Sequence, residues 1–215
     1  MENQPLWVYR KLKGLYFFQF GAMGCLFPVL PLFFEWLGYR KSEIGVLTSL
    51  RPAMSFIFGP SLSLLADSYS IHGVLTMTCH IVSGTMIYCM KFVTAYKTML
   101  VLVLFGAIIR APVSMQMDAH TLLLVGGKNY GIVRQYGAIS YGILSFAGGY
   151  LTGNHASSFN KVFSLWAICC VVAAGFFFAV DLDDKSNVHD KDRQAGIDQD
   201  QNLDVVVDLE LELDQ

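Results

Sequence analysis

The sequence predicts an all-α integral membrane protein with six transmembrane helices and a disordered acidic C-terminal tail. Of its 215 residues, 54% are hydrophobic and only 15% are charged, whereas a soluble domain carries about 25% charged residues. The charges are also unevenly spread, since 12 of the 17 acidic residues lie in residues 181–215. Lipid is therefore the predicted solvent for residues 12–180, and water is the predicted solvent for the tail.

Six apolar runs are long enough to cross a bilayer, which takes roughly 20 apolar residues in a helix. Short segments lie between them, and all but the one between the second and third runs carry Lys or Arg. Together the runs predict a transmembrane domain at residues 12–180, preceded by a short N-terminal segment at residues 1–11. The predicted spans are about Leu12–Leu37, Ile44–Ala66, Val74–Phe92, Met99–Val125, Ile132–Leu151 and Val162–Val180.

The distribution of Lys and Arg favours a cytoplasmic N-terminal segment. With that orientation, and leaving aside Arg51 and Arg110 within the spans, 8 basic residues lie beyond or at the ends of the spans on the cytoplasmic side and 5 on the opposite side, as expected from the positive-inside rule. Six spans return residues 181–215 to the cytoplasmic side. This tail has no aromatic residue and cannot bury enough apolar surface to offset the entropy of ordering, so we expect it to be disordered.

Ionisable side chains inside the spans are candidates for function, because charge at membrane depth is costly and usually faces a polar pathway or another charge. A guanidinium cannot lose its proton to escape hydrocarbon, so Arg110 either forms a salt bridge that locks helices together or faces a cavity for an anionic or hydroxyl-rich ligand. Asp118 can either titrate, which suits proton coupling, or pair with Arg134 at the start of the fifth span. The predicted substrate or ion pathway consists of Gln19, Arg51, Arg110 and Asp118.

Small residues and prolines indicate how the spans pack and bend. The fifth span has small residues at four-residue spacing, among them Gly142, Gly149 and Gly153. In lipid such stripes mark faces where helices touch, so we expect these glycines to contact a neighbouring helix. Each proline frees a backbone carbonyl and bends its helix. The prolines that interrupt the first, second and fourth spans are Pro28, Pro31, Pro52, Pro60 and Pro112.

No motif for covalent catalysis or metal binding is present in the sequence. It has no Walker loop, His-Glu-x-x-His, nucleophile elbow or pair of carboxylates on one helix face. Its five cysteines lie in apolar runs without a CxxC, which is typical of buried small hydrophobic residues. We therefore predict no enzymatic activity, no cofactor, no metal and no nucleic-acid partner. The expected partners are the lipid bilayer, a small polar solute and protons.

Three stretches resemble the major facilitator superfamily, and more narrowly the subgroup around lactose permease and the nucleoside–proton symporters. YFFQFGAMGCLFPVLPLFFEWLGYRKSEIGVLTSLRP (Tyr16–Pro52) looks like the first helix, the outer loop and the start of the second helix of that subgroup. PSLSLLAD (Pro60–Asp67) resembles the end of its second helix. RAPVSMQMDAHTLLL and YGIVRQYGAISYG, within Arg110–Gly142, are similar to its fourth and fifth helices, where an Asp precedes a Y-G-x-x-R-x-x-G pattern.

The resemblance implies the N-terminal six-helix half of a secondary transporter that moves a small polar solute, coupled to protons, by alternating access. It implies that Asp67, the acid of the loop motif G-x-L-x-D-R-x-G-R, helps to hold the inward gate closed, and that Arg110, Asp118 and Arg134 contribute to the cavity or its cytoplasmic rim. The position of Arg134 at the cytoplasmic mouth of the fifth span predicts an ionic latch there. Ser63, Ser68 and Ser70 replace the first Gly, the first Arg and the second Gly of that motif. Such transporters combine two six-helix halves, so a second half or another copy of this chain is the expected partner. The alternative is a non-transporting membrane receptor, regulator or assembly partner.

Overall fold

A computed structural model describes residues 6–69, 72–152 and 158–180, without the side chains of residues 66–69 and 72–74. The Asp67 side chain, Gly153 and the predicted tail therefore lie outside the described part. Apart from the last two residues of the helix Ser158–Val180, the helices discussed below belong to one compact unit, Met1–Phe178. A second unit begins at Ala179, and nearly all of it falls beyond the described residues.

Within the described ranges every long element is a helix, as the apolar runs predict. Three of these helices are long and apolar enough to cross a membrane: Leu6–Trp36, Tyr96–Thr152 and Ser158–Val180. The helices that match the second and third predicted spans are not among the three, so six spans stay a prediction. The elements in chain order are α1 Leu6–Leu26, α2 Leu30–Trp36, α3 Lys41–Tyr69, α4 His72–Cys89, a 3-10 turn Met90–Phe92 and α5 Tyr96–Thr152, followed by the helix Ser158–Val180.

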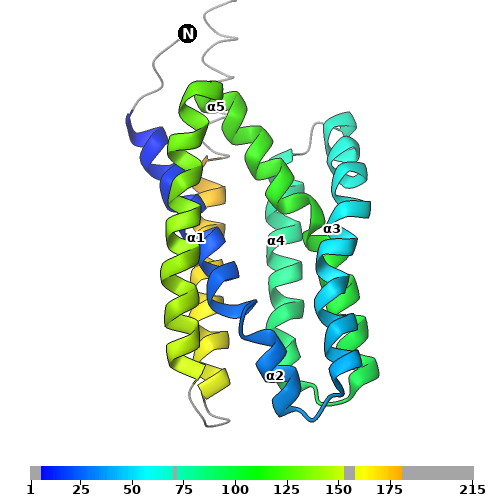
Figure 1. Ribbon diagram of the computed structural model, residues 1–215. Helices are drawn as coiled ribbons and strands as arrows, with labels where there is room; N and C mark the ends of the chain where they lie inside the picture. Colours follow the sequence, from blue (N-terminus) through cyan, green and yellow to red (C-terminus); the bar gives the residue numbers. More distant parts are fainter. Residues whose placement is uncertain (1–5, 70–71, 153–157, 181–215) are drawn as a thin grey trace, which may run out of the picture. The chain divides into compact units, whose positions relative to one another are not determined.

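α5 contains the fourth and fifth predicted spans, which are separated by a kink at Gly126. Its 57 residues contain one non-helical position, Gly126, at φ 72° and ψ 163°. Only glycine takes this backbone region at little cost, so the chain changes direction there and α5 consists of two helical halves. Figure 1 shows the two halves of α5 meeting at this bend, with the first half beside α3 and α4 and the second half beside α1.

Close packing of α1 on the second half of α5 depends on glycine at a few positions. A Cβ added to Gly24 would come within 2.5 Å of the Tyr141 carbonyl oxygen, and one added to Gly148 would collide with the carbonyl oxygen of Cys25. Gly142 and Gly149, the predicted packing glycines, have no atom within 4 Å of such a Cβ. The face of α5 that contacts α1 is therefore a different one from the face that carries Gly142 and Gly149.

The break between α1 and α2 has a physical cause in Pro28. Proline has no backbone N–H, so the carbonyl of Gly24, four residues earlier, loses its helical partner. Ser145 of α5 donates a hydrogen bond from its hydroxyl to this carbonyl, at 3.0 Å. A serine from the neighbouring helix thus replaces the missing donor, as expected for a bent helix in a membrane protein.

The apolar core lies between α1, α2, α3, α4, α5 and the helix Ser158–Val180. Phe33 of α2 makes edge contacts with Phe159 and Phe163, with ring centroids 5.4 and 5.3 Å apart. Trp166 and Met90 are almost fully buried in the same cluster. This core fixes one wall of the cavity described next, because Phe34 and Met90 belong to both.

Candidate functional site

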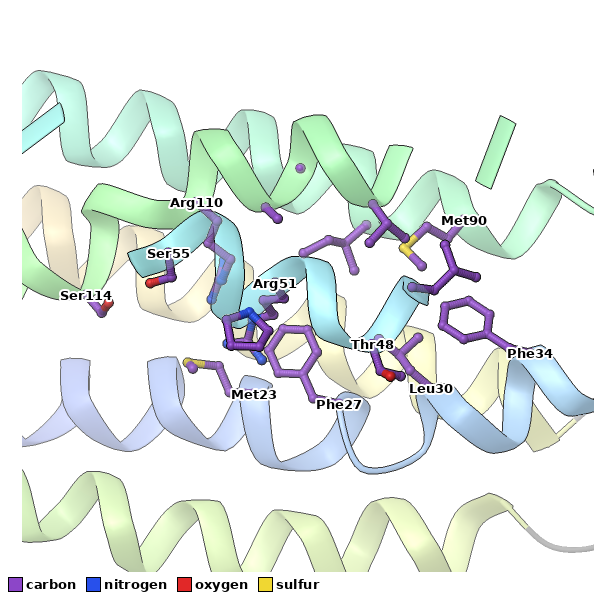
Figure 2. A pocket seen from close by; sticks show the side chains of 16 residues that line it. Met23, Phe27, Leu30, Phe34, Thr48, Arg51, Ser55, Met90, Arg110 and Ser114 are labelled. Carbon is purple, nitrogen blue, oxygen red and sulfur yellow. The ribbon is translucent and has the colours of Figure 1, made fainter. Parts of the chain in front are cut away.

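A cavity of about 360 Å³ lies among α1, α2, α3, α4 and α5 (Figure 2). Its volume is at the lower end of the range of about 300–1,000 Å³ found for small-molecule sites. Five of its lining residues are polar, and all five carry a hydroxyl or a guanidinium: Thr48, Arg51, Ser55, Arg110 and Ser114. The other lining residues are Met23, Phe27, Leu30, Phe34, Leu47, Pro52, Ile87, Met90, Val103, Gly106 and Ala107.

Arg110 of α5 is the most unusual side chain of this cavity. It is only 7% exposed, and neither of its terminal nitrogens, Nη1 and Nη2, has a hydrogen-bond partner among the described residues. Buried polar atoms are normally paired, and an unpaired buried charge is strongly unfavourable. The first half of α5 therefore carries a buried positive charge whose terminal nitrogens receive no hydrogen-bond partner from the described residues.

Arg51 of α3 lines the same cavity and adds a second positive charge. Its guanidinium carbon lies 3.3 Å from the centroid of the Phe27 ring. A cation over an aromatic face is attracted by the negative face of the ring, which positions Arg51 without neutralising it. Figure 2 shows the side chains of Arg51 and Arg110 directed from their separate helices toward the same end of the cavity.

A smaller cavity of about 40 Å³ adjoins this polar end, lined in part by Gln19 of α1 together with Arg51 and Arg110. Gln19 is 1% exposed, and its side-chain oxygen Oε1 has no hydrogen-bond partner among the described residues. Ser55 and Ser114 line both cavities. The polar groups of three helices are thus concentrated in one place.

No acidic side chain lines either cavity among the residues that the structure describes. The acidic side chains of the described part are Glu35, Glu43 and Asp118, and none of them belongs to the cavity wall. Two cations without a counter-charge in a low-dielectric environment produce a strongly positive potential. This part of the molecule is therefore suited to an anionic guest.

A separate ionic cluster joins α1 to both halves of α5. Arg134 donates from Nη1 to Oδ2 of Asp118 at 2.6 Å and also bonds the hydroxyl of Tyr130. Tyr16, fully buried in α1, donates from its hydroxyl to Oδ1 of Asp118 at 2.6 Å. The Arg134 side chain is 49% exposed and the Asp118 side chain 26% exposed. This cluster satisfies its charges internally and remains partly open to the surroundings.

The residues that the sequence singles out therefore fall into two groups. Gln19, Arg51 and Arg110 lie together at the polar end of the cavity. Asp118 lies apart from them and is paired with Arg134, which is one of the two arrangements expected for it. No anionic partner of Arg110 is present in the described residues, so the salt-bridge interpretation of Arg110 has no support there.

Sequence reasoning missed the two serines, although a signal for them was present. Arg51-Pro-Ala-Met-Ser55 and Arg110-Ala-Pro-Val-Ser114 share the pattern Arg-x-x-x-Ser. Residues four apart lie on one face of a helix, so each arginine has a hydroxyl one turn further along. That the two faces meet could not be read from the sequence, because it depends on how α3 and α5 pack. Tyr16 was missed for the same reason.

Comparisons with known proteins agree with this picture of a transporter-like membrane bundle. A curated relative, the "Uncharacterized transporter YwbF" of Bacillus subtilis (strain 168), is 26% identical over 169 residues, which is 77% of this chain and 42% of the relative. The chain thus spans less than half the length of that relative. No solved structure matches the chain. A family model described as the MFS_1 like family matches residues 9–208, and with this match over most of its length the chain belongs to that family of the major facilitator superfamily.

Proposed function

We propose that the chain forms one half of a secondary active transporter that moves a small polar solute, together with protons, by alternating access. The observation that carries the proposal is the cavity lined by the buried Arg110, whose two terminal nitrogens have no partner in the described chain. Ionisable groups inside membrane proteins mark substrate or ion pathways. A solute that supplies the missing partner explains why so costly a group is placed there.

The Asp118–Arg134 pair is the proposed ionic latch and proton-coupling group. It joins the two halves of α5 across the bend at Gly126, and through Tyr16 it also holds α1. An ion pair that is partly exposed costs less to break than a fully buried one. Protonation of Asp118 would remove the negative charge that holds Arg134, which is how proton binding would loosen this end of the bundle. Asp67 is proposed as a second gating residue on the resemblance alone.

A second transporter half is the proposed partner, and the exposed face of α5 supports it. Large apolar side chains recur there at helical spacing, and Gly142 and Gly149 lie between them with open space around them. A stripe of small residues beside exposed apolar ones is a common helix-packing surface in membranes. The exposed apolar residues of this face are Ile139, Ile143, Phe146 and Tyr150.

The arrangement in the membrane is proposed as six spans with both termini on the cytoplasmic side. α3 has 29 residues, which at about 1.5 Å per residue is long enough for a bilayer core of roughly 30 Å. The 57 residues of α5 supply two spans that meet at Gly126.

Transport assays in vesicles test the proposal. The chain is reconstituted alone and together with a candidate second half, a proton gradient is imposed, and uptake of labelled sugars, nucleosides and organic anions is measured. We expect one solute class to accumulate, and we expect a proton ionophore to abolish the accumulation. If neither form moves any of these solutes, the transport proposal is wrong and the non-transporting receptor or assembly role is favoured.

A further inference from the structure

We propose that the cavity selects a small amphipathic organic anion, with its oxyanion group held by Arg51 and Arg110 and its apolar body against Phe34 and Met90. This inference deepens the proposed function, because it names the class of solute that the transporter would move. Three features carry it: the uncompensated positive charge, the division of the cavity into a polar and an apolar end, and the paired Arg-x-x-x-Ser faces.

The charge of the cavity excludes a neutral solute as its best guest. Arg51 and Arg110 face a common space without an acidic side chain in the described wall. A hydroxyl-rich neutral solute would supply hydrogen-bond acceptors but would leave both positive charges uncompensated. A carboxylate or phosphate group supplies acceptors and charge together, and the planar guanidinium fork matches such groups well.

The two ends of the cavity differ in chemistry. In Figure 2 Ser55, Ser114 and Arg110 lie toward one end and Arg51 follows beside Phe27, whereas Leu30, Phe34 and Met90 lie toward the other end, where Thr48 is the polar side chain. An inorganic anion would fill only the first end, and the apolar wall would remain without contacts. Burying an apolar body against that wall removes apolar surface from water and adds to affinity. An organic anion uses both ends.

The serines complete the anion site. Ser55 follows Arg51 by one helical turn, and Ser114 follows Arg110 by the same spacing. Each hydroxyl lines the cavity beside a guanidinium, where it can donate a hydrogen bond to an oxyanion oxygen. α3 and α5 thus each present a guanidinium and a hydroxyl to the same cavity. Both terminal nitrogens of Arg110 are without a hydrogen-bond partner in the described chain.

Calorimetric titration of the purified full chain in detergent tests this inference with matched probes. Benzoate and hexanoate are compared with the neutral amides benzamide and hexanamide, and acetate serves as an anion without a sizeable apolar body. We expect benzoate or hexanoate to bind at least about tenfold more tightly than its amide and than acetate. Equal binding of acid and amide, or no saturable binding of either acid up to about 10 mM, would overturn the inference.

Charge-removing variants locate the binding. Arg110→Gln and Arg51→Gln should each weaken binding of the acid by at least about tenfold. Lys41→Gln is the matched control, because Lys41 is an exposed cation at the start of the helix that carries Arg51, and it should leave the affinity unchanged. Full affinity in both arginine variants would show that the anion binds elsewhere.

Parallel vesicle assays separate this inference from the proposed function. Saturable benzoate binding without uptake of benzoate or of any sugar, nucleoside or other organic anion by vesicles would support the anion site and contradict transport. Uptake of a neutral sugar or nucleoside without any anion binding would support transport and overturn the anion site.

Discussion

Arg110 and Arg134 are both carried by α5, yet the protein treats their charges in opposite ways. Arg134 has Asp118 and Tyr130 as partners, and half of its side chain is exposed. Arg110 is 7% exposed and has no partner for its terminal nitrogens in the described chain. A guanidinium in an apolar bundle can therefore have a structural role or a binding role. The presence or absence of partners within the protein indicates which of the two it has.

The Arg134 cluster is a completed structure, because each charge or hydroxyl has a counterpart from another part of the chain. In the cavity, by contrast, the buried cation Arg110 has no counter-charge among the described residues, and such an arrangement lowers the stability of the folded protein. Natural proteins accept such costs at functional sites. Mutations at the two places should therefore have opposite effects on the ligand-free protein.

The largest expected effect comes from Arg110→Met. Met fills similar space without charge, so the unfavourable burial of an unpaired guanidinium disappears, and we expect unfolding in detergent to require about 1–4 kcal/mol more free energy. Thermal and chemical unfolding measure the change, with Arg134→Met as the comparison. A clear loss of stability in Arg110→Met would indicate that Arg110 has a structural partner.

Tyr16→Phe should act in the opposite direction. Tyr16 is fully buried and its hydroxyl donates to the Asp118 carboxylate, and a hydrogen bond to a charged group contributes about 1.5–3 kcal/mol. We expect a loss of stability in this range, measured by the same unfolding assay. Tyr150→Phe is the control, because Tyr150 is 81% exposed on α5. Equal stability of the two variants would contradict the role of Tyr16 in the cluster.

The contact between α1 and the second half of α5 can be tested by substituting two adjacent glycines. A Cβ at Gly148 meets the backbone of Cys25, whereas a Cβ at Gly149 meets nothing within 4 Å. We expect Gly148→Ala to destabilise the chain by about 1–3 kcal/mol through overpacking, and Gly149→Ala to change stability by less than about 0.5 kcal/mol. The reverse order would mean that α1 packs on the other face of α5.

The smallest effect is expected for Arg134→Gln. Half of the Arg134 side chain is exposed, and ion pairs of this kind contribute about 0–1 kcal/mol. Asp118 keeps the hydrogen bond from Tyr16 in this variant. Unfolding at low and high salt should show a small, salt-dependent difference from the unchanged protein. A loss as large as that of Tyr16→Phe would mean that the pair is more strongly shielded than its exposure indicates.

The helices were predictable from the sequence because apolar runs alone determine which segments suit lipid. The bend at Gly126 was not, since a run of Gly, Lys and Asn also fits a loop. For Asp118 the sequence left two arrangements open, and the choice required knowing that the halves of α5 fold back on each other. Which side of the fifth span contacts α1 could not be read from the sequence, because glycine spacing alone fits more than one face. Gly148, rather than Gly149, makes the contact.

The cavity was predicted in part. Gln19, Arg51 and Arg110 stand out as polar groups in apolar runs, so composition alone identifies them. That these three side chains lie together depends on how α1, α3 and α5 pack, and no local sequence pattern predicts this packing. Phe27 could not be distinguished from the other apolar residues of the first predicted span without that packing.

Anion-dependent stabilisation tests the central claim most directly, namely that Arg110 lacks a partner in the chain and takes one from an anion. A ligand that binds only the folded state raises its stability by about 2.7 kcal/mol at one hundred times the dissociation constant. Unfolding of the unchanged protein and of Arg110→Met is followed with increasing benzoate at constant ionic strength. We predict that benzoate raises the unfolding midpoint of the unchanged protein and leaves that of Arg110→Met in place. Equal shifts in both proteins, or none in either, would contradict the claim.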